Sequence, residues 1–270
     1  MTPVSLGELV ALLESIGQSP RVISSATACH CVVVGVERPE EATEGALSWL
    51  RAGRALPPTW DGTVLIVAHG HTSPWVPRTH PWAMVAVDNP RLAMARILQR
   101  WWHGVVGEIK VDPSARIHPS AVLGASDAGY LWTGDRYELF PHVGGVEIQA
   151  EVEIDPLTVV SRAAIGRTVL GRGTKVGPQV TIGHGSQVGN HCLLVAQVCL
   201  GGSTVLGDRV TMWPRATTAS GVQVGAGAVI GAGAVVLCDV PPGETWAGVP
   251  ARRLRAAAQN AETAPGSAFS

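Results

Sequence analysis

The residues with the clearest potential for chemistry in this sequence are His184 and Gly202. An imidazole ionises near neutral pH, so a histidine in a solvent-accessible turn can take a proton from a reacting group. His184 lies two residues past Ile182 in a repeating pattern, and we expect its side chain to point away from the apolar core. A solvent-exposed turn histidine without a catalytic role would show the same pattern. Gly202 follows 18 residues later, which is one full coil of that pattern.

Histidines and cysteines also bind metals, but their spacing here disfavours a metal site. Cys29-His30-Cys31 places side chains on alternating faces of a predicted strand, and no second ligand pair is nearby. A zinc enzyme of the γ-class carbonic anhydrase type needs three histidines on one zinc, whereas His184 and His191, seven residues apart, do not share a stacked column. The five cysteines are odd in number and lack CxxC spacing, which is typical of free thiols in a reducing cytoplasm.

A repeat of six residues sets the positions of these candidates. Between residues 170 and 236 every sixth residue is apolar except Thr218, and the residue two before each is small or β-branched. A glycine often follows the apolar position, where we expect it to supply turn geometry. This period predicts a left-handed parallel β-helix in which three hexads form one coil and residues 18 apart stack at about 4.8 Å. The apolar series is Leu170, Val176, Ile182, Val188, Leu194, Leu200, Leu206, Met212, Thr218, Val224, Ile230 and Val236.

The same period marks the limits of the β-helix, which we place at residues 105–250 with about six coils. The period begins at Val111, lapses over residues 126–145, and then runs with one short slip to Val236. The aromatic and polar stretch 126–145 is predicted to be an inserted loop, and such loops often carry function. Prolines 241 and 242 end the repeat, since proline cannot donate to the hydrogen-bond ladder. Residues 251–270 are predicted to be a basic end followed by a disordered tail.

Residues 1–104 are predicted to form a separate α/β domain. Ser5–Leu13 has a helical pattern, and a second helix is expected after Asn89, a suitable N-cap that precedes Pro90. Valine- and isoleucine-rich runs indicate strands. These runs are Cys31–Val36, Thr63–Ala68 and Trp82–Val87.

Charge and hydropathy restrict the location and the partners. The net charge of −1 gives no electrostatic basis for binding nucleic acid or an anionic membrane. The N-terminal residues carry Glu8 inside an apolar stretch and lack a basic region, so they predict an amphipathic helix and not a signal peptide. No apolar run reaches the length of a membrane span. We therefore expect a cytoplasmic protein.

The chain resembles the UDP-3-O-acylglucosamine N-acyltransferases of lipid A biosynthesis over residues 1 to about 250. Motifs in both predicted domains carry the resemblance, and the N-terminal match together with the histidine motif is much more specific than the hexapeptide repeats alone. They are Gly35-Val36 with Glu40-Glu41-Ala42 and Gly45-Ala46-Leu47-Ser48-Trp49-Leu50, Val87-Asp88-Asn89-Pro90, His118-Pro119-Ser120-Ala121-Val122, Gly124-Ala125 with Gly129-Tyr130, Phe140-Pro141-His142-Val143-Gly144-Gly145-Val146, and Val180-Thr181-Ile182-Gly183-His184.

The resemblance implies roles for individual residues. His184 falls on the family's general base, and the backbone N–H of Gly202 falls on its donor to the oxyanion. The family also has an acidic residue a few positions before the histidine, where this chain has Val176-Gly177-Pro178. The orienting partner of His184 is therefore missing, or another residue serves. Acceptor-binding positions fall on Trp49, Gly129, Tyr130 and His142.

The C-terminal end resembles a different group, the hexapeptide-repeat transferases that use acetyl-coenzyme A. Asp239-Val240-Pro241-Pro242-Gly243 and Gly248-Val249-Pro250-Ala251-Arg252-Arg253 carry this similarity. Donor-binding positions therefore fall on Gln197, Gly248, Arg252 and Arg253, where arginines can contact phosphates. A solvated basic end is the alternative for the two arginines.

Together these patterns predict an enzyme that moves an acyl group from a thioester to the amine of a nucleotide-linked amino sugar. The donor is either an acyl carrier protein or coenzyme A, used as a co-substrate with no bound cofactor. Transfer to a hydroxyl from acetyl-coenzyme A, and a non-catalytic β-helix that binds sugar nucleotides or assembles a complex, are the alternatives. The resembling enzymes are homotrimers with sites between subunits, so we expect a homotrimer.

Overall fold

The computed structural model describes residues 3–24, 31–50, 55–58, 60–71 and 80–255. Cys29 and His30, which the sequence analysis disfavoured as metal ligands, and the predicted tail at 256–270 lie outside these residues. The chain divides into two compact units. Unit 1 consists of Met1–Val105 and Ala128–Val143, and unit 2 consists of Val106–Asp127 and Gly144–Ser270. The boundary near residue 105 lies close to the expected one, but the insertion groups with unit 1 and not with the β-helix.

Two helices lie in the described part of unit 1, and their starts follow from their N-caps. Helix α1 (Leu6–Ser15) begins after Ser5, whose side chain and that of Glu8 form a reciprocal capping box. Helix α2 (Pro90–Trp101) begins after Asn89, whose side chain accepts a hydrogen bond from Leu92 N at 3.0 Å. Both starts match the sequence prediction, because capping is a local property of the chain.

A sheet of five strands forms the centre of unit 1, in the order β2-β7-β6-β5-β4. Strands β6 and β7 are almost wholly buried and pair in parallel, as their continuous apolar sequences suggest. The three predicted apolar runs all contain strands of this unit. Its strands are β1 (Val4–Ser5), β2 (Arg21–Ser24), β3 (Val32–Val33), β4 (Gly35–Val36), β5 (Ala46–Trp49), β6 (Val64–Ala68) and β7 (Ala83–Val87).

The insertion in the repeat is not an irregular loop but an antiparallel hairpin of unit 1. Strands β11 (Tyr130–Trp132) and β12 (Tyr137–Leu139) pair with Leu131 opposite Glu138. Side chains alternate across the hairpin, so Leu131 is buried on one face while Trp132 and Tyr137 are exposed on the other. Their rings meet edge to face with centroids 5.2 Å apart.

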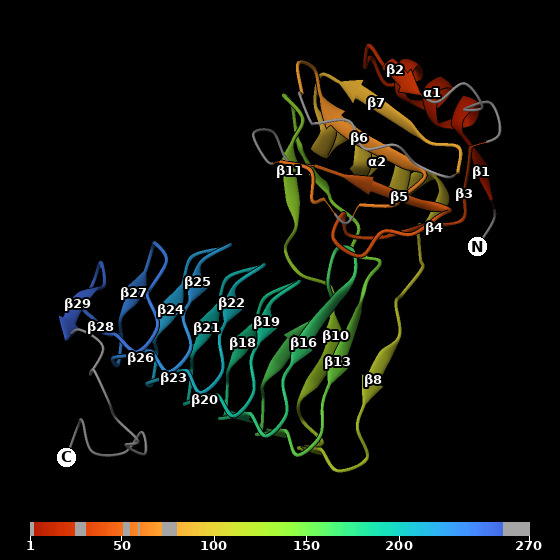
Figure 1. Cartoon of the computed structure of the whole chain (residues 1–270). Helices are drawn as coiled ribbons and strands as arrows, with labels where there is room; N and C mark the ends of the chain where they lie inside the picture. Colours follow the sequence, from red (N-terminus) through yellow and green to blue (C-terminus); the bar gives the residue numbers. More distant parts are fainter. Residues whose placement is uncertain (1–2, 25–30, 51–54, 59, 72–79, 256–270) are drawn as a thin grey trace. The chain divides into compact units, whose positions relative to one another are not determined.

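Unit 2 is a parallel β-helix, which confirms the predicted fold class (Figure 1). Successive coils add one strand to each of three sheets, and two of the sheets contain six strands each. The first sheet contains β8 (Ile109–Val111), β13 (Gly145–Ile148), β16 (Arg167–Leu170), β19 (Gln187–Val188), β22 (Val205–Leu206) and β25 (Gln223–Val224). The second contains β10 (Val122–Ala125), β15 (Val159–Ser161), β18 (Thr181–Ile182), β21 (Cys199–Leu200), β24 (Thr217–Thr218) and β27 (Val235–Val236). The third contains β9 (Arg116–Ile117), β14 (Glu153–Ile154), β17 (Lys175–Val176), β20 (Leu193–Leu194), β23 (Thr211–Met212), β26 (Val229–Ile230), β28 (Thr245–Ala247) and β29 (Arg252–Arg255).

The register of these sheets follows the period of the sequence. Thr181 pairs with Cys199, and Ile182 pairs with Leu200, so residues 18 apart stack as predicted. Between residues 168 and 236 the apolar position of each hexad and the small residue two before it are buried, whereas Val111, at the start of the period, is exposed. Val180 and Ile182, for example, have no exposed surface. The hexad pattern therefore sets both the strand register and the core.

The glycines after the apolar positions do not supply turn geometry, and the role predicted for them was wrong. A Cβ atom at Gly183 would lie 2.7 Å from both Gly202 N and Leu200 O of the next coil. These glycines are needed because backbone atoms of successive coils come too close for a side chain. Positive φ angles occur instead just before the small residue of each hexad, at Gly185 (+68°) and also at Gln197 (62°).

The basic end continues the solenoid beyond the predicted boundary. Strand β29 pairs antiparallel with β28, and Ala251 is buried at the end of the core. Among the residues that the structure describes, no helix is both long and apolar enough to cross a membrane.

Candidate active site

His184 lies in the turn that follows strand β18, at a point where the chain leaves the core. Ile182 anchors the end of this strand in the core, and Gly183 packs against the next coil. The next side chain, that of His184, is directed out of the ladder and is 26% exposed. The solenoid therefore presents the imidazole at its surface, as the sequence predicted.

An acidic partner holds His184, and it comes from a distant part of the sequence. Asp127 Oδ2 lies 2.7 Å from His184 Nδ1 and also accepts the backbone N–H of His184 at 3.0 Å. Asp127 follows strand β10, 57 residues before the histidine, and both residues belong to unit 2. A carboxylate only accepts hydrogen bonds, so this contact assigns the proton of the neutral imidazole to Nδ1 and the lone pair to Nε2. The open question of an orienting acid is thus answered by Asp127.

The sequence prediction missed Asp127 because the repeat does not reach it. Asp127 lies between Gly124-Ala125 and Gly129-Tyr130, two motifs that carried the family resemblance. This position was the one feature of the sequence that could have marked Asp127 as functional. The hexad period lapses there, so no stacking argument could place the side chain beside His184. We refer below to His184 and Asp127 as the dyad.

Gly202 lies directly against the imidazole, one coil further along the solenoid. A Cβ atom at this position would approach Cε1, Nδ1 and Nε2 of His184 to 2.3, 2.7 and 2.7 Å. Gly202 is buried by this contact. Within the part of the chain that the structure describes, its backbone N–H donates to no protein acceptor. Prolines 156, 178 and 214 occupy the same position of other hexads, which shows that the ladder does not use this N–H.

A second histidine of the solenoid packs in a similar way but lacks the acid contact. His191 lies over Gly173, where a Cβ atom would approach its Nδ1 to 2.3 Å. Its ring is exposed, and among the described residues no carboxylate lies within salt-bridge distance of it. Stacking on a glycine is thus a general way to place a histidine on this fold. The dyad distinguishes His184 from His191.

Two cysteines of the solenoid, Cys192 and Cys199, have thiol pKa values above the ordinary value. Burial raises the pKa of the Cys199 thiol, and the negative charge of Asp127 raises it further. The pKa of the Cys192 thiol is raised to about 11, and burial is the largest cause of this increase. Among the described residues no cluster of three or more histidine, cysteine or acidic side chains is arranged to hold a metal ion.

The four predicted acceptor-binding residues all belong to unit 1. Trp49 is half-buried and packs against Phe140, with ring centroids 5.9 Å apart and planes inclined by 35°. Tyr130 is 54% exposed on the hairpin. His142 is buried with its ring against Gly129, where a Cβ atom would approach Cε1 to 2.4 Å. Trp49 and Tyr130 therefore have accessible surface, whereas His142 and Gly129 pack against each other.

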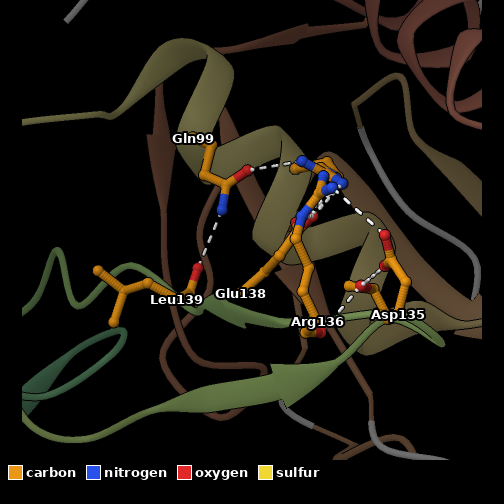
Figure 2. A network of polar contacts seen from close by, with 7 residues as sticks. Gln99, Asp135, Arg136, Glu138 and Leu139 are labelled. Carbon is orange, nitrogen blue, oxygen red and sulfur yellow. Dashed lines mark hydrogen bonds and ion pairs between the residues drawn. The ribbon is translucent and has the colours of Figure 1, made fainter.

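A polar network fixes the hairpin that carries Tyr130 onto helix α2 (Figure 2). Glu138 is nearly buried and binds Arg96 at 2.8 Å and Arg136 at 2.9 Å. Gln99 Nε2 donates to Leu139 O at 2.9 Å. The two guanidinium groups on either side of Glu138 compensate the charge of its carboxylate. The network gives the hairpin a defined position within unit 1.

The predicted donor-binding residues lie at two places on the solenoid. Gln197 forms an exposed ladder with residues 18 positions away on either side, accepting from Arg215 at 2.8 Å and donating to Gln179 at 2.7 Å. Arg253 contacts Glu244 at 3.3 Å near the C-terminal end.

Strand β28 belongs to the same sheet as β20, which is the first strand of that sheet after His184 in the chain. Three strand spacings separate β28 from β20, which is roughly 14 Å along the solenoid axis. Gly248 and Arg252 adjoin β28, Gly248 with a φ angle of +92° and Arg252 paired opposite Ala247. The structure does not bring these residues to the dyad itself. One donor that touched both places would have to extend along the solenoid axis.

Comparison with known proteins gives relatives that match about half of the chain. No family model matches it. A UDP-3-O-acylglucosamine N-acyltransferase of Methylorubrum populi is 36% identical over 153 residues, which is 57% of this chain and 42% of the relative. A UDP-3-O-acylglucosamine N-acyltransferase 2 of Nitrobacter winogradskyi is 46% identical over 140 residues, or 52% and 41% of the two chains. The chain thus spans less than half the length of these relatives.

The solved structures that match the chain do so at low sequence identity and with TM-scores below 0.5. PerB from Caulobacter crescentus, in complex with CoA and GDP-perosamine, is 23% identical with a TM-score of 0.31, covering 71% of this chain and 70% of that one. LpxA of Bacteroides fragilis is 16% identical with a TM-score of 0.44, covering 81% and 71%. The sequence relatives confirm the resemblance stated above: over about half of its length, this chain is similar to UDP-3-O-acylglucosamine N-acyltransferases.

Proposed function

We propose that this protein is an N-acyltransferase that moves an acyl group from a thioester to the amine of a nucleotide-linked amino sugar. The observation that carries the proposal is the dyad stacked on Gly202, which combines an oriented imidazole with an unused backbone N–H. The relatives' name supports the reaction class, because it describes transfer of an acyl group to the nitrogen of a UDP-linked glucosamine.

The chemistry needs a base and a donor to the developing oxyanion. The neutral amine attacks the thioester carbonyl carbon, and its excess proton passes to Nε2 of His184. Asp127 keeps the other ring proton on Nδ1 and stabilises the imidazolium that forms. The carbonyl oxygen becomes an oxyanion, for which the N–H of Gly202 is the proposed donor. The carbon–sulfur bond then breaks, and the imidazolium returns the proton to the leaving thiolate, so that the products are an amide and a thiol.

The donor and the acceptor are assigned at the level of chemical class. Coenzyme A or an acyl carrier protein would present the thioester, and Arg252 and Arg253 are the proposed contacts for its phosphate groups. Trp49 and Tyr130 are the proposed contacts for the nucleotide sugar, because an aromatic face can stack on a base. The name of the PerB structure, which holds CoA and GDP-perosamine, supports testing a coenzyme A donor and nucleotides other than UDP.

Homotrimer formation is part of the proposal. Light scattering should give three times the 28.1 kDa mass of one chain. A monomeric mass would contradict the trimer but would leave the reaction chemistry to be tested separately.

The decisive experiment is a matrix of donors and acceptors with release of free thiol as the signal. Acetyl-CoA, longer acyl-CoA and acyl carrier protein thioesters would be combined with UDP-, dTDP- and GDP-linked amino sugars. For the productive pair, His184→Ala should lower kcat by about 10²- to 10⁴-fold. His191→Ala is the matched control, because it removes a solenoid histidine that also packs on a glycine.

Two results would refute the proposal. The first is full turnover by the His184→Ala variant, and the second is binding of a nucleotide sugar without turnover on any donor. Asp127→Asn adds a separate check, since it keeps the side-chain shape but removes the negative charge. It should lower kcat, because the imidazolium that forms during the reaction loses its counter-charge.

A further inference from the structure

Thr218 is the one residue that breaks the apolar series of the solenoid, and its position explains why a hydroxyl can stand there. It lies on strand β24 directly above Leu200, which immediately precedes Gly201 and Gly202. The side chain of Thr218 is 2% exposed. A buried hydroxyl without partners would be costly, so its hydrogen bonds must be provided within the core.

These bonds form a closed ring around Gly201. Gly201 N–H donates to Thr218 Oγ1 at 3.1 Å, Thr218 Oγ1 and Thr204 Oγ1 are 2.8 Å apart, and Thr204 Oγ1 donates to Gly201 O at 2.7 Å. An N–H group can only donate and a carbonyl oxygen can only accept, which sets the direction of each hydroxyl. Thr218 must therefore donate to Thr204. Thr204 Oγ1 also lies 3.4 Å from Ala219 O, a longer contact than the one it makes with Gly201 O.

The ring acts on the peptide unit that the proposed function uses. The carbonyl of Gly201 and the N–H of Gly202 belong to one planar peptide, so holding the oxygen also sets the direction of the N–H. The same oxygen also accepts from Ser186 Oγ at 3.3 Å. Hydrogen bonds to a carbonyl polarise its amide and make the N–H a stronger donor.

We propose that Thr218 and Thr204 are positioning residues that orient and polarise the Gly202 N–H toward the oxyanion. This inference rests on the proposed function. The inference also explains why the apolar series has a threonine at position 218. A valine or isoleucine would fill the core equally well, but it could not form the ring of hydrogen bonds around Gly201.

The test compares Thr218→Val with a matched control elsewhere in the solenoid. Thr174 is also buried, donates to Gly189 O at 2.9 Å and accepts Cys192 N–H at 3.1 Å. Thr174→Val therefore removes a comparable pair of hydrogen bonds away from the dyad. Thr218→Val should lower kcat roughly tenfold with unchanged KM, less than the loss of an entire oxyanion donor. Thr174→Val should retain kcat, and Thr218→Ser should restore it.

Further readouts separate positioning from general destabilisation. Thr204→Val and the Thr204→Val/Thr218→Val double variant should each match the single Thr218→Val, because the ring acts as one unit. The pH profile of kcat should stay unchanged in Thr218→Val, because the dyad is intact. Without any substrate, the amide proton of Gly202 should move upfield in glycine-labelled Thr218→Val but not in Thr174→Val.

The two proposals can fail separately. If Thr218→Val and Thr174→Val have equal kcat and equal Gly202 amide shifts, the positioning role is overturned while the acyltransferase proposal stands. If His184→Ala keeps full turnover, the proposed function fails first. If Thr218→Val does not fold, Thr204→Val carries the same comparison, and wild-type kcat in that variant would overturn the inference.

Discussion

Replacing Gly202 by alanine tests the geometry of the dyad without removing any catalytic group. The added Cβ would lie 2.3 Å from Cε1 of His184, whereas an ordinary contact begins at 3.4 Å. The imidazole must therefore move by about 1 Å, and a misplacement of this size can cost about 10²-fold in rate, or about 2.7 kcal/mol of transition-state stabilisation. Alanine keeps its backbone N–H, so the oxyanion donor remains.

The variant should fold like the wild-type protein. The atoms nearest to the added Cβ all belong to His184, and the φ angle of Gly202 lies outside the left-handed region. Ala196 and Ser220 occupy the same position of their own hexads, which shows that this corner accepts a side chain. Thermal unfolding should therefore change little, and Ser220→Ala serves as the matched control for kcat.

Steady-state kinetics on the productive donor and acceptor would measure the effect. We expect kcat/KM to fall about 10²-fold in Gly202→Ala and to remain unchanged in Ser220→Ala. In a His184→Ala background the Gly202→Ala change should add no further loss, because the ring it displaces is gone. Wild-type kcat/KM in Gly202→Ala would refute the stacked geometry.

Three further predictions concern ionisation. Asp127→Asn should speed alkylation of Cys199 at pH 8, because losing the nearby negative charge lowers the pKa of the thiol; an unchanged rate in peptide mapping would contradict the contact. Cys192, with its pKa raised to about 11 by burial, should stay unmodified until the protein is unfolded in urea. Burial lowers the pKa of His80, but hydrogen bonds to Pro81 O and Asp61 outweigh it, so the pKa is raised. The resulting stability is present below about pH 6.5 and is lost as pH rises through the raised pKa. Urea unfolding of His80→Asn should lack this decline, and an identical pH slope in both proteins would argue against it.

The repeat explains why so much of the fold was predictable. Each hexad is a local pattern whose apolar residue must enter the core, and three hexads return the chain to the same face. Register, core and the stacking of His184 on Gly202 all follow from counting residues. The helix starts after Ser5 and Asn89 were predictable for a similar reason, since an N-cap involves neighbours within one turn.

Only the tertiary structure decided the groups that act on His184 and Gly202. Asp127 reaches the histidine across 57 residues, at a point where an insertion interrupts the period, so no local rule relates the two. The glycine rows proved to be set by the distance between coils and not by backbone torsion, which a single hexad cannot reveal. The sequence marked Thr218 as an exception, but its purpose depends on where the hydroxyls of two successive coils meet. Periodic local patterns determine the scaffold, whereas contacts between non-equivalent positions of different coils determine the chemistry of the site.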